Sequence, residues 1–188
     1  MKKLVLAVLC IFCLSALCVA ADKDDVVLKA RLRGVQEVPP VASAATGSFA
    51  ALISADGMSI TYTLTYANLN AQVLVSHIHF AFPKENGGVV VFLCGPAAGA
   101  PGGPPAGFPN PPACPDTTSG TVTGTVTAAN VVGPNAQGIT PAMDFAKLIQ
   151  AIHEGAAYVN VHSTRSPGGE IRGQVHSSDL GHHDGDDR

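Results

Sequence analysis

A pair of histidines separated by one residue is the feature of this sequence that most clearly suggests chemistry. His77 and His79 lie in an otherwise apolar stretch. Side chains two residues apart on a β-strand project from the same face, so both imidazoles can reach one metal ion. The alternative is that two partly buried histidines only form hydrogen bonds to neighbouring loops.

A second run of alternating residues carries a third histidine. Residues 158–162 read Tyr-Val-Asn-Val-His, which places Asn160 and His162 on one face of a strand. If this strand adjoins or faces the His77 strand, the three histidines form a site suited to copper first and to zinc second. His153, near the end of an expected helix, is a candidate fourth ligand, although the helix dipole also explains a histidine there.

Three charged residues are candidates for supporting roles. Glu170 and Arg172 follow a glycine turn and share one strand face. Arg172 is a candidate catalytic residue that guides an anion to the metal, and Glu170 can orient a ligand histidine through its second nitrogen. The same pair can instead close the end of the sheet, with Arg172 bound to loop carbonyls. Glu37 is a third buried-charge candidate, for which a salt bridge to an arginine is the simplest explanation.

Other catalytic motifs are missing from the sequence. It contains no G-x-S-x-G serine and no phosphate-binding loop, so hydrolases and nucleotide-dependent enzymes have no support. His182 and His183 stand among aspartates near the end of the chain, where a solvated tail is a better explanation than chelation. Whether the chain is an enzyme stays open, and an enzyme would be a copper-dependent oxidoreductase.

The N-terminus predicts export. Lys2 and Lys3 precede an uncharged stretch at 4–19, and small residues follow at Ala20 and Ala21. This pattern is typical of a cleavable signal peptide at 1–21, so we expect a periplasmic or secreted protein without a membrane anchor. The sequence has 11 basic and 14 acidic side chains, and cleavage removes two of the basic ones. The acidic balance argues against nucleic acid as a partner.

The cysteines predict a disulfide. Three of the five lie in the signal, which leaves Cys94 and Cys114 as an even pair in an exported protein. Two free thiols are the alternative. Residues 95–113 between them hold seven prolines and five glycines, a composition that predicts a surface loop rather than a strand.

The rest of the mature chain is typical of an all-β domain at 22–176, followed by a disordered polar tail at 177–188. Short runs rich in Val, Thr, Ile and Tyr predict about eight strands, at 26–32, 47–54, 58–66, 74–80, 88–93, 120–127, 157–162 and 170–176. One short helix is expected after Thr140, with Pro141 at its first position and Gly155 at its end.

The sequence resembles the CHRD domain, a module first described in chordin and common as a lone exported domain in bacteria. Most of the mature chain carries the resemblance, through Leu32-x-Gly34-x-Gln36-Glu37-Val38-Pro39-Pro40, Ala45-Thr46-Gly47, the strand from Ile60 to Tyr66, His77-Ile78-His79, the run from Tyr158 to His162, and Gly168-Gly169-Glu170-Ile171-Arg172-Gly173-Gln174. The resemblance implies an immunoglobulin-like or related Greek-key β-sandwich or barrel.

The order of the histidines is also similar to that of copper/zinc superoxide dismutases, which carry a His-x-His strand, a later Val-x-His strand and a downstream arginine. This similarity implies that His77, His79 and His162 hold copper and that Arg172 attracts superoxide. The competing hypothesis is a non-catalytic binding or structural module. Its exposed loops, with Phe108 in the 95–113 segment, would contact a protein or matrix partner.

Overall fold

The structure is a computed structural model that describes residues 26–115 and 117–177. The predicted signal at 1–21 and the polar tail from 178 lie outside the described residues. The strands are β1 (Val26–Arg33), β2 (Thr46–Ile53), β3 (Ile60–Ala67), β4 (Val73–Phe80), β5 (Val89–Cys94), β6 (Gly120–Val126), β7 (Ala157–Ser163), β8 (Ile171–Gln174) and β9 (His176–Ser177). The helices are α1 (Phe145–His153) and the short 3-10 turns η1 (Gly34–Gln36), η2 (Ala128–Asn130) and η3 (Asn135–Gln137).

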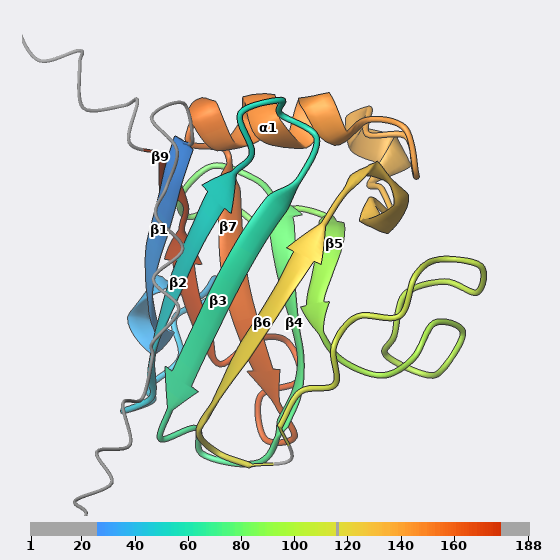
Figure 1. Ribbon diagram of the computed structural model, residues 1–188. Helices are drawn as coiled ribbons and strands as arrows, with labels where there is room; N and C mark the ends of the chain where they lie inside the picture. Colours follow the sequence, from blue (N-terminus) through green and yellow to red (C-terminus); the bar gives the residue numbers. More distant parts are fainter. Residues whose placement is uncertain (1–25, 116, 178–188) are drawn as a thin grey trace, which may run out of the picture.

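The strands form one antiparallel sheet in the order β5-β4-β7-β8-β1-β2-β3-β6, with β9 paired to β1. The sheet curves until β5 and β6, its two ends, approach each other in a nearly closed, barrel-like shape, with β2, β3 and β6 in front of β4 and β5 (Figure 1). The prediction of an all-β fold with one helix is confirmed.

Tyr62 links the two ends of the sheet. Its hydroxyl donates a hydrogen bond from β3 to the carbonyl of Leu93 on β5. The side chain passes over Gly124, its partner on β6, where an added Cβ would lie only 2.5 Å from the tyrosine oxygen. A side chain at position 124 would therefore block the link.

Period-2 alternation places the core inside the sheet. On β3, Ile60, Tyr62, Leu64 and Tyr66 are buried, whereas the threonines between them face outward. Burying the apolar face of every strand supplies the main driving force for this fold. Helix α1 lies across one end of the sheet (Figure 1), and its side chains Leu148 and Ile152 join the core.

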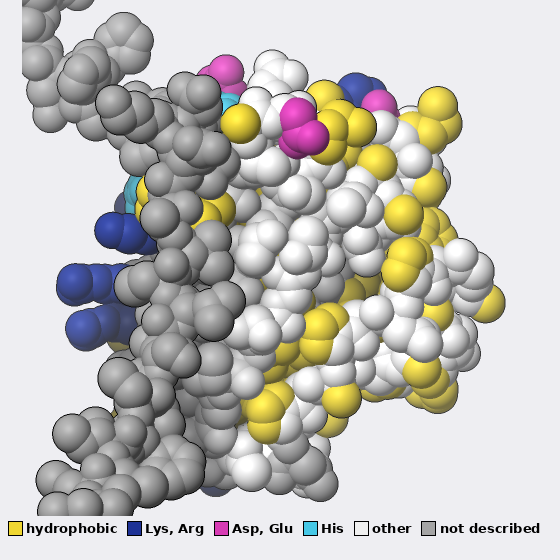
Figure 2. Space-filling view, in the orientation of Figure 1, with side chains coloured by type: hydrophobic (Ala, Val, Ile, Leu, Met, Phe, Trp, Pro, Cys, Tyr) yellow, Lys and Arg dark blue, Asp and Glu magenta, His cyan; other side chains and the backbone are white. Residues whose placement is uncertain are grey.

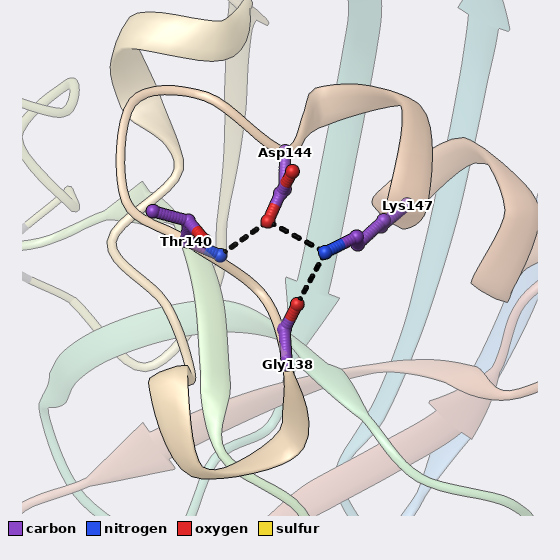
Figure 3. Close-up of polar contacts among 4 residues, drawn as sticks. All are labelled: Gly138, Thr140, Asp144 and Lys147. Carbon is purple, nitrogen blue, oxygen red and sulfur yellow. Dashed lines mark hydrogen bonds and ion pairs between the residues drawn. The ribbon is translucent and has the colours of Figure 1, made fainter.

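The helix begins later than the sequence predicted. Thr140 and Pro141 lie in the preceding turn, and Ala142 has a left-handed φ of 55°, which cannot continue a right-handed helix. Asp144 precedes the first helical residue. Its carboxylate accepts a hydrogen bond from the Thr140 amide at 2.7 Å and forms an ion pair with Lys147 at 2.9 Å (Figure 3). The chain leaves the helix at Gly155, as predicted, with a φ of 68°.

The last predicted strand is two strands. The backbone amide of Val175 leaves the β8 ladder and donates to Ala157, and β9 then pairs with β1 opposite Leu28 and Lys29. Ser177, which the sequence analysis assigned to the tail, is buried in β9.

The loop between Cys94 and Cys114 projects from the sheet (Figure 1), and the two cysteines lie at disulfide distance, with Cα atoms 4.9 Å apart. Among the residues that the structure describes, no helix is long and apolar enough to cross a membrane.

Candidate metal centre

The three histidines lie on the outer face of two neighbouring strands. In the antiparallel pair of β4 and β7, His77 is opposite Asn160 and Val75 is opposite His162. The intervening residues Ile78 and Val161 point inward and are fully buried in the core. The predicted convergence of two histidine-bearing strands is therefore present, on the face that points away from the core.

The ligand nitrogens are close enough to share one ion. The Nδ1 atom of His77 lies 3.1 Å from the Nε2 atom of His162, and one nitrogen from each of His77, His79 and His162 lies within 4.8 Å of the others. Two nitrogens bound to one tetrahedral zinc ion are about 3.3 Å apart, given bonds of about 2.0 Å. The three histidines can therefore hold a metal ion after small side-chain adjustments.

Backbone carbonyls hold the second nitrogens of two of these rings. The Nδ1 atom of His79 lies 2.9 Å from the Gly87 carbonyl, and Nδ1 of His162 lies 2.9 Å from the Pro167 carbonyl. A carbonyl only accepts, so both Nδ1 atoms carry the proton and both Nε2 atoms present a lone pair. Metal-binding histidines commonly have this arrangement, which orients the ring.

The Nε2 atom of His79 is buried and makes no hydrogen bond of normal geometry, although the Asn160 side chain lies close enough to raise the pKa of His79 slightly against the effect of burial. Buried polar atoms are rarely left unpaired, because the lost hydration costs free energy. The sequence could not indicate that this nitrogen lacks a partner, because its position is determined by the hydrogen bond between Nδ1 of the same ring and the Gly87 carbonyl. A metal ion bound to Nε2 would supply the missing partner.

Burial keeps the imidazoles neutral. Desolvation, followed by the neighbouring His162 and His79, lowers the pKa of His77 to about 2. Desolvation likewise lowers the pKa of His79 to about 4, against the opposing hydrogen bond to Gly87, and burial lowers the pKa of His162. Neutral imidazole is the form that binds a metal, so the site is ready for ligation at neutral pH.

The connection at 81–88 covers His79 and the neighbouring side chains Tyr158 and Arg172. It folds back over the outer face, where Gln174 donates to the Ala81 carbonyl at 2.9 Å and His79 contacts Gly87. An added Cβ at Gly87 would lie 1.8 Å from the Phe80 carbonyl oxygen, so only glycine fits this close approach. This cover leaves His79 only 8% exposed, and the Phe92 ring of β5, with its centroid 4.5 Å from that of His77, helps to leave His77 only 7% exposed.

Asn160 and Tyr158 surround the cluster from the same face of β7. The Asn160 Oδ1 atom lies 3.0 Å from Nε2 of His162, on the strand face that the sequence pattern predicted for both residues. Because an amide oxygen and a lone-pair Nε2 both only accept, this contact is not a hydrogen bond in the tautomer that the Pro167 carbonyl selects. Tyr158 stacks on His79, with ring centroids 4.7 Å apart and planes within 3°. Tyr158 was not among the predicted site residues, although its i, i+2, i+4 spacing with Asn160 and His162 could have placed it here.

Arg172 lies on the opposite face of the Tyr158 ring, with its guanidinium carbon 3.4 Å from the ring centroid. Its terminal nitrogens donate to the carbonyls of Glu85 at 2.6 Å and Phe82 at 3.2 Å. The side chain is only 2% exposed. This placement matches the structural alternative of the sequence analysis, in which Arg172 binds loop carbonyls, and does not direct the group toward an incoming anion.

Glu37 is a buried carboxyl group near Arg172. Burial raises the pKa of Glu37 to about 7, against the attraction of Arg172. The predicted salt bridge between Glu37 and an arginine is absent, since within the described residues the only ion pair joins Lys147 and Asp144.

The carboxylate of Glu170 accepts hydrogen bonds from Ser43, from the Asn70 amide and from Ser163. These partners agree with the structural alternative for Glu170, and the second nitrogens of His79 and His162 bind backbone carbonyls instead.

His153, the candidate fourth ligand, is the last residue of α1 and is not a member of the three-histidine cluster that the described residues form.

The family comparison agrees with the fold and with the residues that carry it. The model of the CHRD domain family matches residues 28–175, which include β2 to β8 and all of β1 except its first two residues, whereas β9 follows directly after the match. No curated protein and no solved structure matches the chain. With its three outer-face histidines set within the matched region, the chain belongs to the CHRD domain family.

Proposed function

We propose that this chain is an exported CHRD protein that binds one copper ion through His77, His79 and His162. The observation that carries the proposal is the buried Nε2 atom of His79, which has no partner and belongs to a ring held by Gly87. A purely structural histidine would be expected to use both nitrogens. The signal peptide predicted at 1–21 and the paired cysteines support export.

The chemistry of the donors favours copper over zinc. Imidazole nitrogen suits both ions, but divalent copper binds a given nitrogen site more tightly than zinc does. The cluster offers three histidines, one fewer than a structural zinc site uses, but three histidines with an open position also fit a catalytic zinc ion, so the preference for copper rests on its tighter binding to nitrogen. A three-coordinate protein site leaves a position for a small ligand.

The enzymatic form of this proposal is superoxide dismutase-like redox activity. Bound copper would supply one-electron chemistry there. The protein's own contribution is the cover at 81–88, which limits access of water, and the stack of His79 on Tyr158, which fixes the ligand ring. The buried position of Arg172 gives anion guidance no support, so metal binding is the primary proposal.

Metal content of the mature protein, expressed to the periplasm, tests the proposal. Elemental mass spectrometry is expected to find about one copper per chain after copper loading and removal of excess ion. The variant His77→Ala/His79→Ala/His162→Ala is expected to lose it, and the milder His79→Gln is expected to weaken copper binding at least about tenfold. Circular dichroism checks that each variant is folded.

Two other histidines provide controls. His176→Ala alters an exposed histidine of β9 that lies outside the cluster, and copper content should not change. His153→Ala tests the predicted fourth ligand, and full copper binding by this variant would show that His153 is not a ligand. Folded wild-type protein that stays metal-free after copper and zinc loading would overturn the proposal.

A non-catalytic binding module is the second candidate. The segment that the disulfide closes projects away from the sheet (Figure 1), and a projecting loop of this kind can contact a protein or matrix partner without affecting the fold. Phe108 on this loop is half-buried. If metal binding fails, Phe108→Ala in a pull-down from extracellular material is the next experiment.

A further inference from the structure

A cleft opens on the same outer face, beside the strands that carry the histidines. Its volume is about 840 Å³, within the range of small-molecule sites, and β1, β8, β9 and the segments near Glu37 and Lys84 line it. Arg172 and Gln174 contribute its β8 side. None of the three cluster histidines lines the cleft, so it is a separate feature.

Basic side chains surround this cleft. Lys29 and Arg31 alternate on the outer face of β1, and Lys84 reaches in from the β4–β5 connection; all three are exposed. Lysine and arginine side chains project together at the edge of the molecule beside β1 (Figure 2). Within residues 26–115 and 117–177 none of these three cations has an ion-pair partner. Their charge is therefore available to an anionic ligand.

Glu37 is the only carboxyl group in the lining. It is 5% exposed, and its Oε1 atom has no hydrogen-bond partner. The carboxyl group lies against Gly169, where an added Cβ would come within 2.6 Å of Oε1. Oε1 faces Gly169 and is closed to solvent, so a ligand hydroxyl in the cleft would reach the carboxyl group through a small rotation of the Glu37 side chain and would supply the missing hydrogen bond.

Apolar groups make up the remaining wall. Val35, Val38, Pro40 and Pro83 line the cleft, and Val35 is 69% exposed despite its size. An apolar surface beside unpaired cations suits a molecule with an apolar body and an anionic end, because each part then meets its complement.

We propose that this cleft binds a small organic anion. The anionic group pairs with Lys29 and Arg31, a ring or other apolar body packs on the valines and prolines, and a hydroxyl or similar group forms a hydrogen bond with Glu37. The site is independent of the metal centre, so its test does not depend on copper.

Three matched probes test the proposal by calorimetry or by amide chemical shifts in the full mature chain treated with EDTA. 4-Hydroxybenzoate carries the anion, the ring and the hydroxyl. Benzoate lacks the hydroxyl, and 4-hydroxybenzyl alcohol lacks the charge. We expect saturable binding of 4-hydroxybenzoate with a Kd of about 1 mM or below, weaker binding of benzoate, and at least about tenfold weaker binding of the alcohol.

Arg31→Ala is expected to weaken 4-hydroxybenzoate binding about tenfold. Arg33→Ala is the matched control, since Arg33 is exposed on the same face of β1 but does not line the cleft. Glu37→Gln keeps the shape of the side chain and should reduce the preference for 4-hydroxybenzoate over benzoate.

Some results would overturn the proposal. Equal losses in Arg31→Ala and Arg33→Ala would show diffuse charge attraction instead of a site. Equal binding of the charged and uncharged probes would exclude the cationic contacts. Loss of binding in the folded triple-histidine variant would place the anion at the metal centre.

Discussion

Two regions of the outer surface of this sheet differ, although the same hydrophobic core lies behind both. On β3 and β6 the outward residues are threonines, and Thr61–Thr125 and Thr65–Thr121 contact each other at 3.1 Å across the strands. This side of the molecule carries mostly uncharged side chains that are open to solvent (Figure 2). Such pairs satisfy their hydroxyl groups at little cost.

On β4, β7 and β8 the outward residues are histidines, an asparagine, a tyrosine and an arginine, and loops bury them. None of His77, His79, His162, Asn160 and Arg172 is more than 8% exposed. Burying so many polar groups opposes folding unless each is paired, and His79 keeps an unpaired nitrogen. The threonine face shows that the fold itself does not need this arrangement, so a functional cause is the better explanation.

The largest expected difference between the faces is in pH dependence. The folded pKa values of about 2 for His77 and about 4 for His79 lie below the ordinary value of 6.5. The unfolded chain therefore binds more protons below pH 6.5, and the stability that these neutral histidines contribute is complete above pH 6.5 and lost as pH falls. The contribution of each histidine to the free energy of unfolding should therefore fall by about 2 kcal/mol between pH 6.5 and pH 4.5.

Glu37 acts in the opposite direction, because its raised folded pKa of about 7 lets the folded state gain protons first as pH falls. The histidine contribution is therefore measured as the difference between wild type and His77→Gln/His79→Gln, both of which keep Glu37. Urea unfolding in EDTA at pH 6.5, 5.5 and 4.5 should show wild type losing about 4 kcal/mol relative to the variant. Parallel pH profiles would contradict the assigned burial.

The next effect comes from the arginine that holds the cover. Arg172→Met keeps a long apolar stem but removes the donors to the carbonyls of Phe82 and Glu85. We expect the free energy of unfolding to fall by about 3 kcal/mol, because the buried guanidinium no longer donates to the two loop carbonyls and no longer stacks on Tyr158.

Equilibrium urea unfolding measures this change, with Arg33→Met as the exposed control on β1. A loss no larger than that of the control would mean that the arginine does not hold the cover in place.

Much of the fold followed from local pattern. The alternation in 58–66 predicted β3, and the His-x-His spacing predicted that His77 and His79 share a face, because strand geometry alone determines both. The helix start was wrong, since the Asp144 contacts and the left-handed Ala142 replaced the turn that Pro141 suggested. When two neighbouring residues can both begin a helix, residue propensities alone do not show which of them does.

The parts of the site that the sequence did not predict depend on contacts between distant segments. The carbonyls of Gly87 and Pro167 orient the ligand rings, yet a backbone group carries no sequence signature. The partners of Glu170 lie up to 127 positions away, at Ser43. Such contacts are known only once the loops are placed, which is why the sequence left two roles open for Glu170 and did not indicate its partners Asn70 and Ser163.

The smallest effect is expected on the threonine face. Thr61→Val removes one exposed cross-strand hydroxyl contact with Thr125 and keeps a β-branched side chain that fits the strand. Urea unfolding should detect a change of less than about 0.5 kcal/mol, with no change in copper content or in the pH profile. A loss as large as that of Arg172→Met would mean that the solvent-exposed face also contributes strongly to folding, and burial of the histidine face would then no longer stand out as a sign of function.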